Sequence, residues 1–555
     1  MKLINKLSFA LLLFTGTAMA QQAPENWFNL DEGTSSVPGV STEKTYQELL
    51  KNKKSETIIV AVLDSGVDPD HEDLKSVMWV NRGEIPNNNI DDDKNGYVDD
   101  IHGWNFIGGK DGKNVDHDNL EATRLLRKFQ QQFGDKPKTA IGKSDMADYE
   151  LFKKLDKEVN EKLEEMSGNA ALYGGLLNAM STLEKEVGKE DITVEDLEKL
   201  ESDDPLVSRA AIVTQNLLQQ GTDFKSIKKD LTEAYDYFYS QANYYYNTEY
   251  DPRNIVGDNY ANPNDRNYGN NDVQGPDASH GTHVAGIIAA ERTNDLGVKG
   301  VADNVEIMSV RCVPDGDERD KDVANAIRYA VDNGASIINM SFGKGYAWDK
   351  GAVDAAVKYA RKNDVLLVHA AGNSSENNDL GGNFPNDNYE KSGWFKPKKA
   401  KNWIEVGAAS WKGGEELPAR FSNYGKENVD IFAPGVDILS TTPDQSYDTF
   451  GGTSMASPVI AGVAAILRSY YPDLSAEQVK DIITTTATPR NIQVKLPGSD
   501  ELVSFRDLSV TGGTVNAYNA VKAASKVKGK KKRKKGAKGG SGSNGSSKKP
   551  DVARP

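Results

Sequence analysis

The chain has 555 residues, of which 37% are hydrophobic, and a formal net charge of −15 at neutral pH. This length suits two or three ordinary domains, or one large domain with an insertion, and the apolar fraction is enough to build a core. The acidic balance argues against nucleic acid as a main partner. The single cysteine, Cys312, excludes an intrachain disulfide.

The first twenty residues, "MKLINKLSFALLLFTGTAMA", place two lysines before a short apolar run and end on small residues. This pattern is typical of a secretory signal peptide with its cleavage site. The run is too short to cross a bilayer, and no later segment is long and apolar enough, so we expect no transmembrane anchor. The sequence therefore predicts a signal peptide at 1–20 and an exported protein, either periplasmic or extracellular.

Apolar and β-branched runs, typical of buried parallel strands, occur at 56–63, 305–313, 335–342 and 365–372. Helical patterns lie between and after them at 283–291, 322–334 and 352–363. This alternation predicts an α/β fold in which helices cover both faces of a parallel sheet. Chemistry in such sheets gathers at the carboxyl ends of the strands, where Asp64, Ser341 and Asn373 stand. Cys312 falls within a predicted strand, which favours a packed core thiol over a nucleophile.

The stretch "GGTSMASP" contains Ser454, and a serine hydroxyl needs a base to become a nucleophile. That base is usually a histidine oriented by a buried carboxylate. The segment "DASHGTHVAG" supplies His280 and His283 on one face of a predicted helix. Two histidines at this spacing could also bind a metal ion, but a third ligand at a typical zinc spacing is lacking.

Three segments resemble the subtilisin (subtilase) family of serine proteases: "VAVLDSGVDPDHEDL", "HGTHVAGIIAA" and "GGTSMASPVIAG". They follow that family's order of acid, base and nucleophile. The resemblance implies a subtilisin-like parallel sheet and a secreted serine endopeptidase, with Ser454 as nucleophile, His280 as general base and Asp64 as the orienting carboxylate. The alternative is a catalytically silent subtilase-fold protein that binds peptides or acts as a scaffold in the cell envelope.

The resemblance also assigns groups around these three residues. It implies that Asn373, in "HAAGNSS", donates to the oxyanion, although an asparagine that only forms a turn is the simpler reading of that segment alone. It implies that Ser341, Phe342 and Gly343, in "INMSFGKG", pair with an extended polypeptide substrate.

The segment "NNNIDDDKNGYVDDIHGWNF" begins like a calcium-binding loop, with alternating acidic and amide side chains before a glycine. The twelfth position, where a bidentate glutamate belongs, is His102, so another carboxylate must complete the shell. We expect a structural Ca²⁺ site here, against the alternative of a solvated acidic turn. Its candidate ligands are Asp91, Asp93, Asn95, Tyr97 through its backbone carbonyl oxygen, Asp99 and Asp100.

The segment "PDGDERDKD" follows a predicted strand where the resemblance places the rim of the substrate cleft. We expect Asp317, Glu318 and Asp320 to face the substrate there and to favour a basic residue before the cleavage site. A solvated acidic loop is the alternative.

Asp64 and His280 lie roughly 215 residues apart, much farther than in a compact subtilase. The intervening sequence has helical periodicity and an aromatic-rich end, which predicts a helical insertion that caps the cleft, mediates self-association or only stabilises the domain. The expected organisation is a signal peptide at 1–20, a catalytic domain at 21–115 and 251–524, the insertion at 116–250 and a tail at 525–555.

The tail contains a Lys/Arg run followed by a Gly/Ser-rich run. Such a composition cannot bury a core, so we expect a disordered segment. Its charge makes it a candidate for contact with anionic envelope surfaces, against the alternative of a solvated tail without a specific partner.

Overall fold

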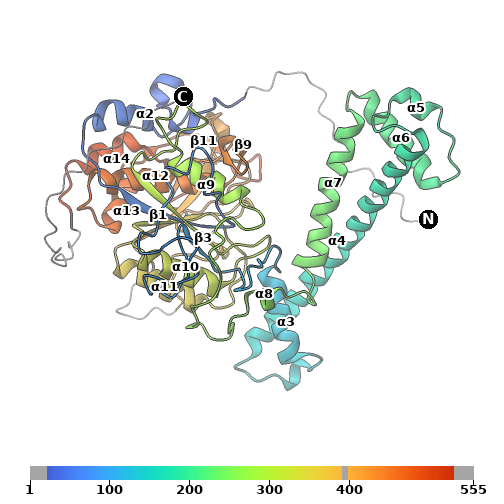
Figure 1. Cartoon of the computed structure of the whole chain (residues 1–555), viewed down its shortest axis with the longest axis horizontal. Coiled ribbons are helices and arrows are strands. Elements are labelled where there is room, and N and C mark those ends of the chain that lie inside the picture. Colours follow the sequence, from blue (N-terminus) through green and yellow to red (C-terminus); the bar gives the residue numbers. More distant parts are fainter. Residues whose placement is uncertain (1–21, 391–397, 531–555) are drawn as a thin grey trace.

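The computed structural model describes residues 22–390 and 398–530. The predicted signal peptide and most of the predicted basic tail lie outside these residues. A nine-stranded sheet forms the centre of the larger body in Figure 1, with strand order β10-β13-β7-β6-β5-β4-β1-β3-β2. Neighbouring strands pair in parallel except β10 and β13, which are antiparallel.

The strands of this sheet are short and, apart from the edge strand β10, almost entirely buried. They are β1 (Ile58–Asp64), β2 (Gly103–Asn105), β3 (Val305–Arg311), β4 (Ile337–Met340), β5 (Leu366–Ala370), β6 (Trp403–Ala409), β7 (Ile431–Pro434), β10 (Thr488–Pro489) and β13 (Gly513–Thr514). Burial on both faces explains why their sequences are continuous apolar runs and not alternating ones. The four strands expected from sequence are present, each within a few residues of its predicted limits.

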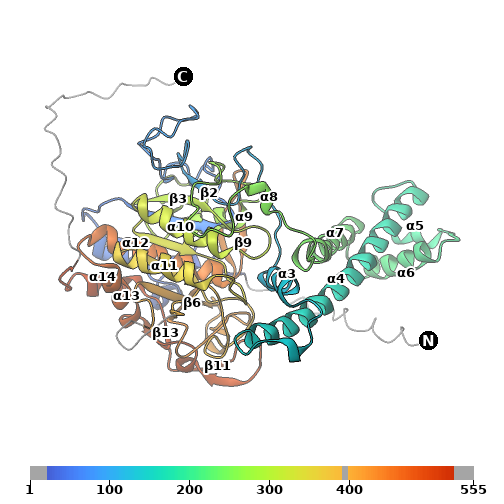
Figure 2. The same cartoon turned by 90° about the horizontal axis from the view of Figure 1, so that it is seen from below.

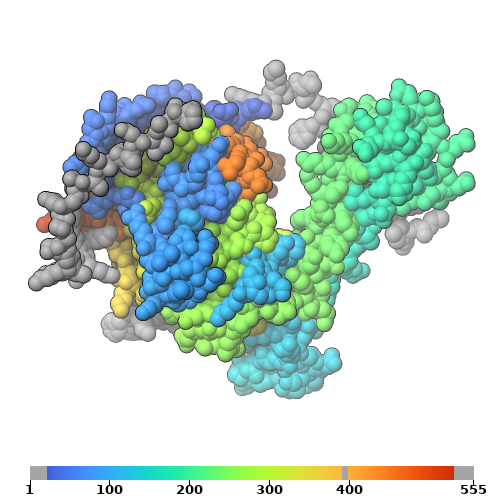
Figure 3. Space-filling model, in the orientation of Figure 1, coloured from blue at the N-terminus to red at the C-terminus, as the bar shows by residue number. Residues whose placement is uncertain are grey.

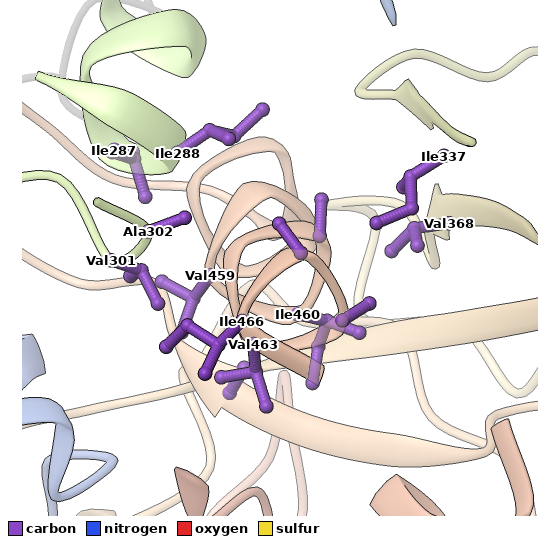
Figure 4. Packing of buried hydrophobic residues seen from close by; sticks show 14 of the residues in the cluster. Ile287, Ile288, Val301, Ala302, Ile337, Val368, Val459, Ile460, Val463 and Ile466 are labelled. Atoms are coloured by element: carbon purple, nitrogen blue, oxygen red, sulfur yellow. The ribbon is translucent and has the colours of Figure 1, made fainter. Parts of the chain in front are cut away.

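Helices cover both faces of the sheet, as predicted. One face packs against α9 (Ser279–Ala289), α12 (Thr453–Tyr470), α13 (Ala476–Thr485) and α14 (Ala517–Ala524), and the other against α10 (Asp320–Asp332) and α11 (Lys350–Lys362). Figure 4 shows Val459, Ile460 and Val463 of α12 inside the first of these cores. Gly462 permits this close packing, because a Cβ atom there would lie 2.5 Å from Cβ of Val301.

The insertion forms a separate helical arm (Figures 1 and 2). It contains α3 (Glu121–Phe133), α4 (Met146–Val187), α5 (Val194–Glu198), α6 (Pro205–Gln219), α7 (Phe224–Ser240) and a last turn, η5 (Gln241–Tyr245). Side-chain caps at Thr193, Asp204 and Asp223 begin three of these helices. Helix α3 lies against the α/β body, whereas α4 and α7 run side by side away from it (Figure 1).

The arm has two apolar cores. The proximal core joins α3 to the start of α4 through Leu126, Phe129 and Phe152, and reaches Trp348 of the α/β body. The distal core lies between α4, α6 and α7 and is made only of arm residues. The predicted α/β architecture with a mostly helical insertion is therefore confirmed, and the distal half of the arm has its own hydrophobic support.

The remaining elements are short. They include α1 (Glu32–Ser35), α2 (Thr42–Lys44), α8 (Arg253–Val256), and the hairpins formed by β8 (Ile438–Thr442) with β9 (Ser446–Phe450) and by β11 (Gln493–Lys495) with β12 (Leu502–Ser504). Short 3₁₀ or π turns complete them: η2 (Trp27–Asn29), η3 (Thr45–Leu50), η4 (Lys138–Ala140), η6 (Gly414–Glu416) and η7 (Phe505–Asp507). Cys312 is a free thiol that is completely buried. Within residues 22–390 and 398–530, no helix combines the length and the apolar character that crossing a membrane would need.

Candidate active site

Asp64 and His280 meet at the carboxyl edge of the sheet. Asp64 is the last residue of β1, and His280 is the second residue of α9. Nδ1 of His280 lies 2.7 Å from Oδ1 of Asp64, which also accepts the amide hydrogen of Ser65 at 2.9 Å. The Asp64 side chain is 3% exposed and the His280 side chain 38%. This contact places the proton on Nδ1 and leaves Nε2 as the basic nitrogen.

The pKa of His280 is raised above its ordinary value. Burial is the largest influence and disfavours the charged imidazolium, but the charge and hydrogen bond of Asp64 and the charge of Asp277 outweigh it. The imidazole therefore holds a proton more firmly than a free histidine does. This is the property that a base needs when it takes a proton from a hydroxyl.

Ser454 lies in the first turn of α12, held against the strand end that contains Ser341. Its Oγ donates to the carbonyl oxygen of Ser341 at 3.1 Å, and Oγ of Ser341 donates to the carbonyl oxygen of Ser454 at 2.8 Å. Among the described residues, the Ser454 hydroxyl donates to Ser341 and not to His280. The contact between hydroxyl and imidazole is therefore not formed in this conformation; such contacts commonly tighten only when substrate binds.

Asn373 and the amide of Ser454 face one point beside Gly452. The Asn373 side-chain oxygen accepts from the amide and the hydroxyl of Thr453, both at 2.9 Å. This fixes the orientation of the carboxamide and turns its NH₂ group toward Gly452. A Cβ atom on Gly452 would lie 3.4 Å from Nδ2 of Asn373 and 3.5 Å from the Ser454 nitrogen. Two hydrogen-bond donors thus converge on a small space next to the serine, the arrangement that stabilises an oxyanion.

His283 points away from this site. It is fully buried, and its Nε2–H donates to the carbonyl oxygens of Ile438 and Asp448 at 3.0 and 3.1 Å. Its ring stacks on Phe450, and burial is the main cause that lowers its pKa to about 4. These contacts suit a structural residue that ties α9 to the hairpin of β8 and β9. They leave His280 as the histidine beside Asp64.

Ser341 and Phe342 line a cavity of about 260 Å³ together with Asp64 and His280. Ser341 is buried and Phe342 half-buried, whereas Gly343 is exposed. A Cβ atom on Gly343 would lie 2.5 Å from Oδ1 of Asn383, so glycine is needed for this close approach. The segment after β4 therefore borders the space in front of the dyad, where the sequence had placed a substrate-binding strand.

The acidic segment after β3, which includes Asp317, Glu318 and Asp320, does not form the exposed rim of the substrate cleft that we expected from the sequence. Glu318 and Asp320 are 2% and 3% exposed, and Asp320 pairs with the buried ammonium of Lys344 at 2.7 Å. Burial raises the pKa of Glu318 to about 8. Asp317 accepts the amide hydrogen of Glu121, the first residue of α3, at 2.7 Å. The prediction was wrong because the insertion covers this segment, which the local sequence does not reveal.

The candidate metal ligands divide into two groups. Carboxylate oxygens of Asp93 and Asp100 lie within 4.8 Å of each other and of Glu84, a residue that the sequence analysis missed. Asp91 and Asp99 lie outside this cluster and accept backbone amide hydrogens, from Asn95 and Gly96 and from Asn88 and Asn89 respectively. The Glu84 carboxylate also accepts two, from Asp93 and Asp99, so this bonding does not by itself separate the two groups.

Asn95 donates its side-chain amide to Asp93 and Asp100, and the Tyr97 ring packs in the core. Burial raises the pKa of Asp100 to about 6. Three clustered carboxylates suit a hard divalent ion such as Ca²⁺. Glu84 stands only seven residues before Asp91, so an acidic residue just upstream of the loop was the available signal.

Comparison with known proteins identifies the family. The model of the subtilase family matches residues 55–505. Relatives include the thermophilic serine proteinase of Bacillus sp. (strain AK1), 37% identical over 244 residues that cover 44% of this chain and 52% of that protein. Subtilisin DY of Bacillus licheniformis is 40% identical over 215 residues, which cover 38% of this chain and 70% of that protein.

Another relative is the cell wall-associated protease of Bacillus subtilis (strain 168), 35% identical over 235 residues that cover 42% of this chain and 24% of that protein. A solved protease structure from Pseudoalteromonas arctica is 31% identical, covers 44% of this chain and 70% of that chain, and has a TM-score of 0.35. The chain spans about half the length of most of the curated relatives it matches. The family match covers most of the chain, and the chain therefore belongs to the subtilase family.

Proposed function

We propose that the protein is a secreted serine endopeptidase that hydrolyses peptide bonds in polypeptides. Membership of the subtilase family supports the peptidase class. The observation that carries the proposal is the constellation around Ser454: a buried carboxylate hydrogen-bonded to an imidazole, and two donors converging beside the serine. Efficient hydrolysis by a serine, histidine and aspartate triad uses these parts together.

In this proposal Ser454 Oγ attacks the substrate carbonyl carbon while Nε2 of His280 takes its proton. Asp64 keeps the proton on Nδ1 and stabilises the imidazolium that forms. Asn373 and the Ser454 amide bind the oxygen that becomes negative. The imidazolium then returns its proton to the leaving amine, and a water molecule repeats the sequence to release the acyl group. Rotation of the Ser454 side chain from the Ser341 carbonyl toward His280 precedes attack.

The alternative is a catalytically silent subtilase-fold protein that binds peptides or acts as a scaffold in the cell envelope. The contact between Asp64 and His280, and the side-chain NH₂ of Asn373 and the amide of Ser454 beside Gly452, favour the endopeptidase over this alternative. Single alanine substitutions of Ser454, His280 and Asp64 separate the two. We expect each to abolish nearly all hydrolysis of an unfolded protein, with double variants adding little, because the groups act as one unit. If the wild type hydrolyses no peptide and binds peptides as tightly as the alanine variants do, the result supports the scaffold.

We further propose that Glu84, Asp93 and Asp100 hold a structural Ca²⁺ ion. The donor set supports this, because hard cations prefer carboxylate and amide oxygens. The ion would neutralise a partly buried acidic cluster and brace the loop between β1 and β2. It would take no part in the reaction.

The remaining assignments are proposals on the same basis. We infer a catalytic domain at 21–115 and 251–524, interrupted by the insertion at 116–250, and export to the periplasm or the medium. Polypeptides are the expected partners, and nucleic acid is not. Contact of the tail with anionic surfaces and self-association through the insertion remain hypotheses.

A further inference from the structure

Two segments border the cavity beside His280 and run from it toward the insertion. The first wall, residues 313–318, follows β3, and the second wall, residues 341–344, follows β4. Val313, Pro314 and Asp315 of the first wall and Ser341 and Phe342 of the second line the cavity. A polypeptide that reaches Ser454 in extended form would lie between the two walls, as the proposed function requires.

The root of the insertion is attached along the first wall. The amide of Asp315 donates to the carbonyl oxygen of Asp116 at 2.8 Å, and its carbonyl oxygen accepts from the amide of Asp118 at 2.9 Å. A Cβ atom on Gly316 would lie 2.3 Å from the carbonyl oxygen of Asp118. The root therefore covers one edge of this wall. The opposite edge, which faces the cavity, is left uncovered.

Helix α3 then binds the end of the first wall through Arg124. This guanidinium is 1% exposed and donates to the carbonyl oxygens of Asp317 at 2.9 Å and Glu318 at 3.2 Å. It also forms an ion pair with Glu121 at 2.9 Å. Burial by itself would raise the pKa of Glu121, but the charges of Arg124 and Lys344 outweigh burial and lower this pKa to about 2.

Lys344 joins the two walls at this same place. Its ammonium is buried and donates to the Glu318 carbonyl oxygen and to Oε2 of Glu121, both at 2.6 Å. It also pairs with Asp320 at 2.7 Å. The second wall, the first wall and the insertion therefore share one buried ionic cluster. The Glu318 carbonyl, which would otherwise be available to an incoming strand, is already bound by two cations.

Exposure changes abruptly along both walls. Gly343 and Asp315 are exposed, whereas Lys344 is 4% and Glu318 2% exposed. Within residues 22–390 and 398–530, Gly316 uses neither its amide nor its carbonyl group in a hydrogen bond. Backbone pairing is thus open beside Gly316 and Ser341–Gly343 and closed immediately beyond them.

We propose that the insertion root closes the substrate cleft upstream of the cleavage site, with Lys344 and Glu121 as the seal. This inference rests on the proposed endopeptidase function and specifies its substrate requirement. An extended strand that pairs with three wall residues covers about three residues. The protein therefore recognises about three substrate residues before the scissile bond, and the next residue leaves the cleft without pairing.

The test is a series of N-acetylated peptide p-nitroanilides with one to six residues before the leaving group. We expect kcat/KM to rise through about three residues and then to change less than about twofold. An open cleft would add two backbone hydrogen bonds with each further pair of residues, which corresponds to roughly a tenfold rise. A continued rise of that size at the fourth to sixth residues would overturn the proposal.

Binding of the same acetyl peptides as free acids to Ser454→Ala keeps this test separate from the proposed function. If the wild-type protein hydrolyses none of the peptides, the proposed endopeptidase function is refuted. The dependence of binding affinity on peptide length would still show where the cleft ends. Affinity that stops rising at about three residues supports the seal, and affinity that rises to six contradicts it.

Lys344→Ala addresses the seal itself, and Lys350→Ala, which removes the Lys350–Asp354 ion pair on α11, is the matched control. In Lys344→Ala we expect kcat/KM to rise further when the fourth and fifth substrate residues are added. The control should keep the wild-type dependence of kcat/KM on peptide length. If Lys344→Ala folds and its profile stays flat, Lys344 is not the seal. If it does not fold, the wild-type series and the binding series decide the proposal.

Discussion

Gly452 shows how closely the chemistry around Ser454 depends on one missing side chain. Its φ angle of 164° is extended backbone that any residue can adopt, so the requirement for glycine is not conformational. A Cβ atom there would stand in ordinary contact with Nδ2 of Asn373 and with the Ser454 nitrogen. The proposed reaction would place its oxyanion in this space.

Gly452→Ala should therefore fold normally and lose activity. We expect turnover of a short peptide to fall about a hundredfold or more, the scale for loss of one oxyanion donor, with a melting temperature within a few degrees of wild type. The matched control is Gly451→Ala, whose Cβ would lie 3.8 Å from its nearest neighbours. Equal activity in the two variants would argue against an oxyanion site at this point.

His280 gives the reaction a pH dependence of definite sign. The base must be neutral to accept a proton, so kcat/KM should fall as the pH drops through its pKa, which lies above the ordinary 6.5. Asp277→Asn removes one of the charges that raise this pKa, so the acidic limb should move to lower pH while activity persists. Asp481→Asn, an exposed change on α13, should leave the limb in place. A limb that does not respond to Asp277 would contradict this account of the base.

At the scale of elements, the chain's own pattern predicted the sheet, its covering helices and the elements that carry Asp64, His280 and Ser454. These features are local, because continuous apolar runs and helical periodicity depend on neighbours in sequence. The acidic segment after β3 could not be read in this way. Its burial depends on Arg124 and Lys344, which contact it from distant parts of the chain.

The arrangement of side chains in the loop between β1 and β2 was predicted only in part, because it too depends on the folded backbone. The spacing of Asp93 and Asp100 indicated carboxylates, but which oxygens face one another depends on how the backbone turns. The fold turns Asp91 and Asp99 away from the cluster and brings Glu84 into it, although Glu84 also accepts backbone amide hydrogens.

Chelation should reveal whether this cluster binds calcium. EDTA should lower the melting temperature of the wild type, and added Ca²⁺ should restore it by mass action. Glu84→Gln and Asp93→Asn should each remove most of that response. Asp92→Asn, next in the loop but outside the cluster, should keep it. A melting temperature indifferent to both EDTA and calcium would leave only a solvated acidic turn.

At the scale of the whole molecule, the protein is a catalytic body with a long arm (Figure 3). The distal core of the arm consists of its own residues, whereas its root contacts both walls of the cleft. In this conformation the distal parts of α4 and α7 project away from the rest of the chain (Figures 1 and 2). A projecting arm of this size would hinder the approach of a folded protein more than that of a peptide.

Removal of the distal arm tests this idea without disturbing the root. We expect replacement of residues 176–233 by a short Gly/Ser linker to leave peptide hydrolysis within about twofold of wild type, because the deleted core is separate. Cleavage of a folded protein relative to a peptide should increase. An unchanged ratio would assign the distal arm to stabilisation or to another partner, and size-exclusion chromatography of both proteins would detect a loss of self-association.

The most direct measurement of the central claim is covalent labelling with a fluorophosphonate, followed by mapping of the modified residue by mass spectrometry. Such a probe reacts with a serine only where a base and an oxyanion site activate it. The account predicts modification of Ser454 in the wild type, much slower labelling in His280→Ala and none in Ser454→Ala. Failure of the folded wild-type protein to label, or modification at a residue other than Ser454, would contradict it.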